Sequence, residues 1–283
     1  MLTLVESISL AGDRAKQNDD ACGQSHGVAW VIDGATDLHE TPLTQTASDA
    51  SWLAHTLDTA LHAYAYPGSG SEAALRSQLA RVMQELIAPL FEELIEGQEI
   101  ERWQRPIASL LMLGETPDGV DGIDLGDCRL AAVDASGASV LIGGPDDAAD
   151  AETRLAAQQT DADKPLLRRE GTIARLRDMR AALNQEGAHW TVCLDAACAS
   201  HARGWRISLQ RPAHLLLMTD GFSALIDRYH SYDAAGLVKA ALGKGLQELG
   251  RELRAIETAD AGGAKHPRFK PSDDATALLL RLS

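Results

Sequence analysis

The apolar positions along the chain follow two spacings, one typical of strands and the other of helices. Residues 2–10 alternate between apolar and polar side chains, as a half-buried strand does. Short apolar stretches bounded by turn residues predict further strands at 27–32, 107–113, 120–125, 128–133, 139–142, 205–209, 214–218 and 275–282. Helical spacing predicts helices over 44–64, 71–96, 173–186 and 234–256. Pro89 is expected to kink or divide the second helix.

The order of these elements excludes a regular alternation of strand and helix. Strands come first, followed by two helices, strands, a helix, strands, a helix and a final strand. No glycine-rich phosphate loop follows a strand, so a doubly wound parallel sheet is disfavoured. Turns within 107–142 suggest an antiparallel meander, and 205–218 is expected to form a hairpin across 210–213. The pattern favours antiparallel sheet packed between helices.

Composition and charge exclude several classes of partner. The chain has 283 residues, of which 45% are hydrophobic and 24% charged, enough apolar side chains for a sizeable core. Its formal charge of −15 argues against nucleic acid and against an acidic membrane surface, because both attract clustered Lys and Arg. No apolar run approaches the ~20 residues of a membrane span, and no secretory signal is visible. The four cysteines show no metal-type pairing, so we expect reduced thiols in a cytoplasmic protein.

Aspartates recur where predicted strands begin or end, and this recurrence is the main chemical signal in the sequence. Four stand at such positions: Asp33, Asp127, Asp220 and Asp273. A single Asp-Gly pair after a strand is most simply a turn. Neighbouring strand ends, however, can bring several carboxylates into one small space, where they raise each other's pKa unless a cation lies among them. Oxygen ligands of this kind select Mg²⁺ or Mn²⁺ over zinc, and two such ions can promote displacement at phosphorus.

Five short motifs, in the same order along nearly the whole chain, resemble those of the type 2C metal-dependent protein phosphatases (PPM family) of bacterial type. They are Gly12-Asp13-Arg14 with Asn18-Asp19-Asp20-Ala21, Val31-Ile32-Asp33-Gly34, Leu125-Gly126-Asp127-Cys128-Arg129, Met218-Thr219-Asp220-Gly221-Phe222 and Asp273-Asp274-Ala275-Thr276. Each motif alone is weak, and the evidence lies in their order and separation. The resemblance implies an α+β fold, a four-layer αββα sandwich with two antiparallel sheets between helix pairs. It also implies that 1–283 is a single phosphatase catalytic domain with a variable flap-like segment at about 143–205.

The same resemblance implies two bound Mn²⁺ or Mg²⁺ ions, with a third as an open alternative. The metal ligands that it implies are Asp20, Asp33, Gly34 through its carbonyl, Asp127, Asp220 and Asp273. Asp33 would bridge the two ions, and Asp220 and Asp273 would complete the shell of the second. Asp127 would belong to the third, weaker site.

Three residues are implied to take part in hydrolysis. Arg14 would hold the substrate phosphate, a task that suits the planar fork of a guanidinium. Asp33 would act on the metals directly, and Asp19 largely through bound water. The nucleophile would be metal-activated water, with no covalent enzyme intermediate. The implied activity is therefore Mn- or Mg-dependent hydrolysis of phosphoserine and phosphothreonine in proteins.

The chain departs from the family pattern at three single positions. Asp19 stands where a glutamate is usual, and Cys128 replaces a serine, which we interpret as a tolerated small residue and not as a catalytic thiol. Ala35 follows the first Asp-Gly, where many members have a histidine regarded as the general acid. His39 is a possible replacement, although an exposed loop histidine is the simpler interpretation. Without such an acid, good leaving groups are hydrolysed more readily than alkyl phosphates.

A fourth departure covers the stretch between the middle strands and Asp220, where the usual family motif is not recognisable. Residues 146–164 are acidic and alanine-rich and predict a surface loop or a short helix. The arginines between 168 and 180 either meet an acidic phosphopeptide or form a solvated helix face. The departure in this stretch affects the prediction of the substrate and does not affect the prediction of the reaction.

Three other functions remain open on the sequence alone. The same centre suits a small phosphoester as substrate, and the same fold suits a non-catalytic regulator that binds a phosphoprotein. The retained aspartates argue against the regulator, since buried carboxylates without a metal cost stability. A calcium-binding structural domain is disfavoured, because the chain has no compact Asp-rich calcium loop. We therefore expect a cytoplasmic, monomeric enzyme with a phosphoprotein as its partner.

Overall fold

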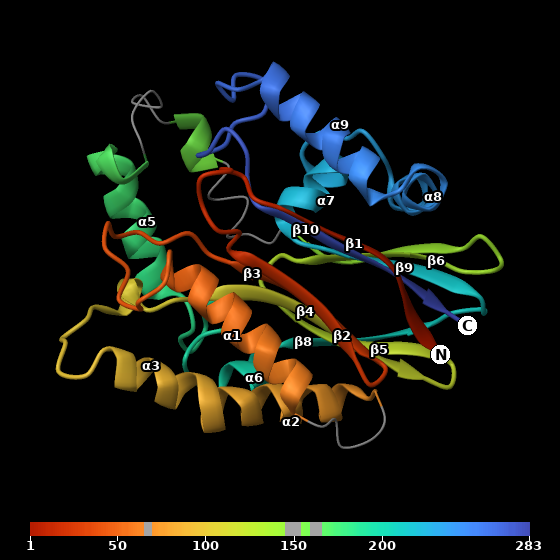
Figure 1. Cartoon of the computed structure of the whole chain (residues 1–283), viewed down its shortest axis with the longest axis horizontal. Coiled ribbons are helices and arrows are strands. Elements are labelled where there is room, and N and C mark those ends of the chain that lie inside the picture. Colours follow the sequence, from red (N-terminus) through yellow and green to blue (C-terminus); the bar gives the residue numbers. More distant parts are fainter. Residues whose placement is uncertain (65–69, 145–153, 159–165) are drawn as a thin grey trace.

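Two antiparallel sheets of five strands lie face to face in the computed structural model, which describes residues 1–64, 70–144, 154–158 and 166–283 (Figure 1). The first sheet has the order β1 (Leu2–Leu10), β10 (Ala275–Leu282), β9 (Ala213–Met218), β6 (Arg129–Val133) and β7 (Ser139–Gly143). The second has the order β2 (Asp20–Ser25), β3 (Val28–Gly34), β4 (Ala108–Thr116), β5 (Gly119–Leu125) and β8 (Arg203–Ser208). The first sheet therefore joins strands from both ends of the chain with strands from its middle.

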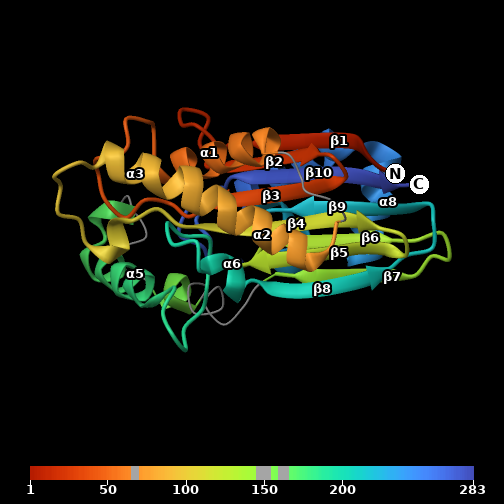
Figure 2. The same cartoon turned by 90° about the horizontal axis from the view of Figure 1, so that it is seen from below.

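Helices cover the outer face of each sheet and complete four layers (Figures 1 and 2). The second sheet is covered by α1 (Asp49–Ala63), α2 (Glu72–Val82) and α3 (Ala88–Leu94). The first sheet is covered by α7 (Asp220–Asp227), α8 (Ala234–Lys244) and α9 (Leu246–Ala259). Two further helices are α5 (Glu170–Ala182), beyond one end of the sheets and opposite the two termini, and α6 (Cys198–His201). The predicted α+β sandwich is confirmed.

Alternating side chains bury both faces of the central strands. In β3, Trp30 and Ile32 pack toward the helices, whereas Ala29 and Val31 pack against the other sheet. The apolar residues of β10 are divided in the same way between the outer helices and the space between the sheets. Successive side chains of a strand point to opposite faces, so a strand covered on both faces is apolar throughout. This explains the continuous apolar stretches in the sequence.

The long second helix is divided just before Pro89, as predicted. α2 ends at Val82, a π-helical turn covers Met83–Ile87, and α3 begins at Ala88. The amide of Ala88 donates to the carbonyl of the residue five positions earlier. A proline has no amide hydrogen with which to continue the regular helical pattern, so a wider turn precedes it.

Two predicted strand pairings are wrong, and both fail where the chain crosses between the sheets. The segment 107–142 is not one meander, because β4 and β5 belong to the second sheet and β6 and β7 to the first. The segment 205–218 is not a hairpin, because β8 pairs with β5 whereas β9 lies between β10 and β6. Apolar patterning indicates that a strand is buried but not which sheet it joins.

Other elements differ from the sequence-based expectation in extent. The short, polar strand β2 and the helix α7 directly after β9 were not predicted. The helix expected over 234–256 is two helices, α8 and α9, separated at Gly245. Most of the stretch 146–164 lies outside the described residues, and within it 154–158 are helical. None of the described helices is long and apolar enough to cross a membrane.

Candidate metal centre

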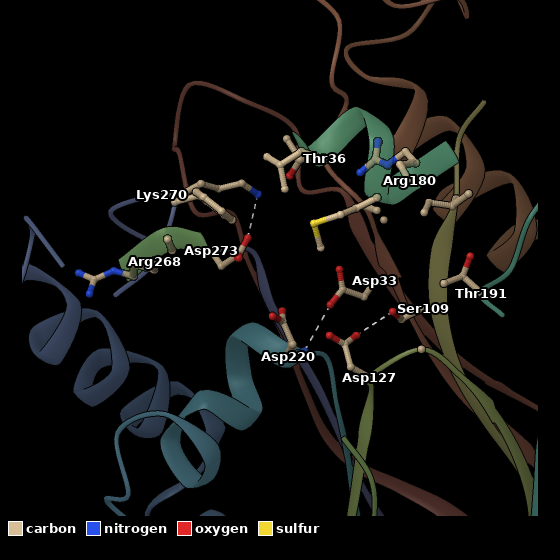
Figure 3. A pocket seen from close by; sticks show the side chains of 18 of the residues that line it. Asp33, Thr36, Ser109, Asp127, Arg180, Thr191, Asp220, Arg268, Lys270 and Asp273 are labelled. Atoms are coloured by element: carbon tan, nitrogen blue, oxygen red, sulfur yellow. Dashed lines mark hydrogen bonds and ion pairs between the residues drawn. The ribbon is translucent and has the colours of Figure 1, made fainter. Parts of the chain in front are cut away.

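Five aspartates come together where strands of both sheets begin or end, and Figure 3 shows four of them. Asp33 stands near the end of β3 and is paired in register with Asp20, the first residue of β2. Asp127 lies in the turn after β5, and Asp220 begins α7 directly after β9. Asp273 precedes β10. The fold thus brings together aspartates that are more than two hundred positions apart in the sequence.

Four of these carboxylates form one side, here called the floor, of a cavity of about 420 Å³. The floor consists of Asp33, Asp127, Asp220 and Asp273. Asp20 is buried behind it and only 2% exposed. The volume falls within the range of about 300–1,000 Å³ that is usual for ligand sites.

Neutral donors hold these carboxylates in place. The backbone amide of Asp220 donates to Oδ2 of Asp33 over 3.3 Å, and the hydroxyl of Ser109 donates to Oδ1 of Asp127 over 2.7 Å. Asp20 accepts a hydrogen bond of 2.7 Å from the hydroxyl of Thr219. Such donors orient a carboxylate without cancelling its charge, so the repulsion between the aspartates persists.

Burial and crowding make the ionised form of these groups unfavourable. Burial, followed by repulsion from Asp20 and Asp220, raises the pKa of Asp33 well above its usual range. Burial likewise raises the pKa of Asp20, and burial together with repulsion from Asp273 raises the pKa of Asp220 to about 7. A divalent cation among them would favour ionisation, because it supplies the missing opposite charge. Carboxylate oxygens are the hard ligands that suit Mg²⁺ and Mn²⁺, so the residues present fit the implied metals.

Two glycines allow the main chain to come close to the floor. A Cβ at Gly34 would lie 2.5 Å from the carbonyl oxygen of Asp19 and 2.9 Å from that of Ala50. At Gly221 a Cβ would lie 1.9 Å from the carbonyl oxygen of Asp274. Any larger residue would therefore displace the backbone beside a predicted metal ligand. The glycine of each Asp-Gly pair is required by packing.

Asp274 fastens the N-terminal motif to the closing motif. Its carboxylate accepts hydrogen bonds from the backbone amide of Gly12, over 2.7 Å, and from that of Asp19, over 2.8 Å. Asp19 in turn accepts a hydrogen bond from the hydroxyl of Ser48, and burial raises its pKa to about 6. The sequence shows Asp274 only as part of a motif, and its positioning role emerges from these long-range contacts.

Arg14 and Asp19 do not line the cavity, whereas Asp33 lies at its floor. Arg14 is exposed in the turn that follows Gly12. Asp19 is partly buried beside the start of β2. The catalytic roles that the resemblance assigns to these two residues remain predictions.

Lys270 and Arg180 supply positive charge at the cavity. Nζ of Lys270 lies 2.9 Å from Oδ1 of Asp273. Burial raises the pKa of Asp273, but the charge and the hydrogen bond of Lys270, together with the charge of Arg228, bring it below its usual value. Figure 3 shows Lys270 on one side of the carboxylates and Arg180, from α5, on the other. The only signal for Lys270 in the sequence is its position three residues before Asp273.

The arginines between 168 and 180 do not form one basic patch. Arg168 forms an exposed ion pair of 2.9 Å with Glu40. The guanidinium of Arg177 lies 4.2 Å above the ring centre of Trp103. Arg180 lines the cavity. A solvated helix face is therefore an incomplete description of α5, since one side of it contacts the rest of the protein.

His39 is not an exposed loop histidine. Its side chain is 10% exposed, and its Nε2 lies 2.8 Å from Oδ2 of Asp49. Asp37, His39 and Asp49 have side-chain atoms that could bind a metal within 4.8 Å of one another. Both carboxylates, however, already accept hydrogen bonds from backbone amides, for instance Asp49 from Leu43 over 2.9 Å. His39 does not line the cavity, whereas His189 does. The loop folds back onto the start of α1, where His39 contacts Asp49.

The family model described as protein phosphatase 2C matches residues 13–251, well over half of the chain. The chain belongs to the protein phosphatase 2C family. Membership makes it a metal-dependent serine/threonine protein phosphatase. No curated protein sequence matches it.

Solved structures of similar fold include bacterial phosphatases. The serine/threonine phosphatase PstP/Ppp of Mycobacterium tuberculosis is 15% identical with a TM-score of 0.56, over 100% of this chain and 99% of that chain. MsPP from Mycobacterium smegmatis, in complex with cacodylate, is 16% identical with a TM-score of 0.54, over 99% and 100%. The catalytic domain of PstP in complex with two manganese ions is 16% identical with a TM-score of 0.52, over 99% of each chain. At such identities the matches show a shared fold.

Cys128 and Arg129, which follow Asp127 in the family motif, have packing and positioning roles. Cys128 is fully buried between the two sheets, and burial raises the pKa of its thiol well above the usual value. This agrees with a small packing residue. Arg129 donates to Oδ1 of Asp227 over 2.6 Å and to the carbonyl of Gly143 over 2.6 Å. The bond to Asp227 fastens β6 to the end of α7, the helix that Asp220 begins, and the bond to Gly143 fastens β6 to the end of β7.

Proposed function

We propose that this phosphatase hydrolyses phosphoserine and phosphothreonine in proteins in a reaction that depends on Mn²⁺ or Mg²⁺. The observation that carries the proposal is the convergence of five aspartates at one cavity within a protein phosphatase 2C fold. The PstP structure with two manganese ions supports the choice of metal. When bound, such ions supply an activated water and balance the charge of a phosphate.

The position of each carboxylate suggests how the ions are held. Asp33 lies on the floor of the cavity, and its carboxylate and the carbonyl of Gly34 would help to hold the ions. Asp220 and Asp273 would hold the second ion. Asp127, on the side of the floor next to Ser109, would belong to a third site (Figure 3).

Residues around the floor would act on water and phosphate. Asp20 and Asp19, which lie behind the floor, would accept hydrogen bonds from bound water. Arg14 is proposed to hold the phosphate from its exposed turn, and Lys270 and Arg180 add positive charge within the cavity itself. Since Ala35 replaces the usual histidine, substrates with good leaving groups should react fastest.

We further propose that residues 1–283 form one catalytic domain whose segment at about 143–205 is a variable flap. The contribution of α5 to the cavity supports this assignment. The four cysteines are free thiols, which suits the reducing conditions of the cytoplasm. A cytoplasmic location and a monomeric state remain predictions.

A small phosphoester is the second candidate substrate, because α5 helps to limit the cavity to about 420 Å³. A non-catalytic regulator that binds phosphoproteins on the same fold is a weaker alternative. These functions differ in whether a phosphate is hydrolysed and in which substrate carries it, so one set of assays separates them.

The decisive experiment is hydrolysis of a phosphothreonine peptide and of p-nitrophenyl phosphate with Mn²⁺, with Mg²⁺ and with a chelator. We expect both substrates to be hydrolysed with metal and neither with chelator, and Asp220→Asn to lose activity. Asp118→Asn is the matched control, since Asp118 is exposed in the turn between β4 and β5, away from the cavity. Activity in chelator, or an unimpaired Asp220→Asn, would contradict the metal mechanism. Hydrolysis of the aryl ester alone would favour a small phosphoester, and phosphopeptide binding without any hydrolysis would favour the regulator.

A further inference from the structure

Apolar side chains line part of the cavity that has the carboxylates as its floor. Six side chains that line it form what we call the apolar wall: Leu38, Ile107, Leu176, Met179, Leu183 and Phe269. Leu176 and Met179 belong to α5, and Leu183 is the residue at which this helix ends. Hydrolysis of a phosphate by metal-activated water does not require such a surface. The apolar wall therefore relates to what the phosphate is attached to.

The apolar wall is held in a defined position by arginines. Arg177 donates to the carbonyl of Leu38 over 2.7 and 3.1 Å while its guanidinium stacks on Trp103. Arg102 donates to the carbonyl of Leu183 over 2.9 Å and to that of Asn184 over 2.6 Å. These bonds tie both ends of the cavity-facing part of α5 to other segments. A surface fixed in this way binds an apolar group without first having to order itself.

Packing beneath α5 supports the same conclusion. Leu38, Leu176, Met179 and Phe269 belong to a small apolar cluster separate from the three large cores. Leu38 and Leu176 are buried, whereas Met179 and Phe269 are only partly buried and also line the cavity. The cluster thus has a buried base and a surface open to the cavity. Met179 adds adaptability, because an unbranched thioether fits side chains of different shape.

The charges of the cavity decide how a substrate lies in it. A phosphate must approach the metal-binding floor, where Lys270 and Arg180 provide positive charge on opposite sides (Figure 3). The group next to the phosphate is then left facing the apolar wall. A polar or charged neighbour would lose hydration there, whereas a large apolar one gains by leaving water.

Resting on the proposed protein phosphatase activity, we propose that the apolar wall is a specificity pocket for a large apolar side chain next to the phosphorylated residue. The substrate is then a flexible phosphopeptide segment with a residue such as Leu, Met or Phe beside the phosphoserine or phosphothreonine. A volume of about 420 Å³ accommodates the phosphorylated residue and one such neighbour. A folded surface would not enter a cavity of this size, which favours an extended segment.

The test compares phosphothreonine peptides that differ only in the residue before or after the phosphothreonine, with Leu, Phe, Ala or Ser at that place. We expect kcat/KM to be about tenfold higher for the Leu or Phe peptide than for the Ser peptide, as burial of a large apolar side chain predicts. Met179→Gln, which keeps the length of the side chain but makes it polar, should remove most of this preference. Arg175→Gln is the matched control, because Arg175 is exposed on the same helix.

A second variant distinguishes a pocket from a merely structural wall. Met179→Ala enlarges the pocket and should shift the preference from Leu toward Phe or Trp, a change that loss of folding does not produce. Equal kcat/KM for all peptides, or a preference unchanged in both Met179 variants, would overturn the inference and leave the phosphatase activity standing. If no peptide is hydrolysed but apolar alkyl or aryl phosphates are, with a dependence on Met179, the assignment to a peptide is overturned together with the proposed protein substrate.

Discussion

The floor and the apolar wall of the cavity are built in opposite ways. The floor takes one aspartate from each of four distant segments, and each is placed by the beginning or end of a strand. The wall takes most of its side chains from α5 and from loops beside it, and arginine contacts hold it. The floor is charged and self-repelling, whereas the wall is apolar and self-associating. The comparison separates the predicted metal centre from the proposed substrate surface.

The two regions also contribute differently to stability. Carboxylates with raised pKa values disfavour the folded state at neutral pH unless a cation is bound among them. The apolar cluster under α5 stabilises the fold by burial, with or without a metal. In the metal-free protein, removing a charge from the floor should therefore raise stability, whereas removing an apolar side chain from the wall should lower it.

The largest effect is expected for Asp33→Asn. We expect turnover with Mn²⁺ to fall more than about 100-fold, since even residues that only orient metal ligands cost 10–100-fold when changed. In the presence of chelator the same variant should unfold at higher urea concentration than the wild type, because a repelling charge has been removed from a buried group. Turnover and urea midpoints are compared with those of Asp118→Asn. A variant that is inactive and also less stable without metal would show that Asp33 serves folding as well.

A pH dependence of the metal-free protein follows from the raised pKa values. The pKa of Asp220 rises from 3.8 to about 7 and that of Asp19 to about 6, so the folded state binds more protons than the unfolded state between these values. The contribution of these two groups to stability then falls as pH rises from about 4 to about 7, by an amount of the order of a few kcal/mol. Urea unfolding in chelator at several pH values measures this fall.

The contribution of the floor is isolated by a difference between two proteins. Other titrating groups, such as the carboxyls of Asp49 and Glu115, whose pKa values are lowered, change stability in the opposite direction and at lower pH. Subtracting the stability of Asp220→Asn from that of the wild type at each pH cancels the contributions of these other groups. This difference in stability should shrink as the pH is lowered. With saturating Mn²⁺ it should vanish only if Asp220→Asn still binds the metal. A difference that is constant with pH would contradict the raised pKa.

The floor could be predicted from the sequence because its signals are local. Each aspartate stands next to an apolar strand, and two are followed by a glycine that the packing requires. Order along the chain then indicates that the strand ends belong to one site. The sheet that each strand joins could not be predicted in the same way, because β5 and β6 follow each other along the chain, are both buried and yet belong to different sheets.

The wall could not be predicted, because it depends on contacts between distant segments. The helix at α5 follows from its sequence, but it has only three buried residues, Thr172, Ile173 and Leu176, so its pattern does not say which face meets the cavity. That face is set by Arg177, which reaches Leu38 and Trp103. The burial of His39 against Asp49 also depends on how the chain folds back on itself, whereas the ion pair of Lys270 with Asp273 is local, between residues three positions apart.

A smaller effect, on the affinity for Mn²⁺, is expected for Lys270, whose ammonium group contacts the floor at Asp273. Lys270 must leave Asp273 before both oxygens of this carboxylate are available to a metal. Lys270→Gln should therefore bind Mn²⁺ about threefold to fivefold more tightly, a modest gain because the pair is partly exposed to solvent. Calorimetric titration of the metal measures this, with Lys270→Arg as the control that keeps the charge. Weaker binding in Lys270→Gln would mean that Lys270 orients Asp273 for the metal and does not compete with it.

The smallest effect is expected for Arg177→Ala, which loosens the wall without touching the floor. The variant loses the stacking on Trp103 and the bonds to the carbonyl of Leu38, together worth about 1 kcal/mol at a partly exposed site. Amide hydrogen exchange in α5 should become faster, and KM for a peptide with an apolar neighbour should rise about twofold to threefold, while Arg175→Ala leaves both unchanged. Affinity for Mn²⁺ reports on the floor alone and should not change. If it falls together with the exchange protection of α5, the floor and the wall are energetically coupled, and the separation between metal centre and substrate surface does not hold.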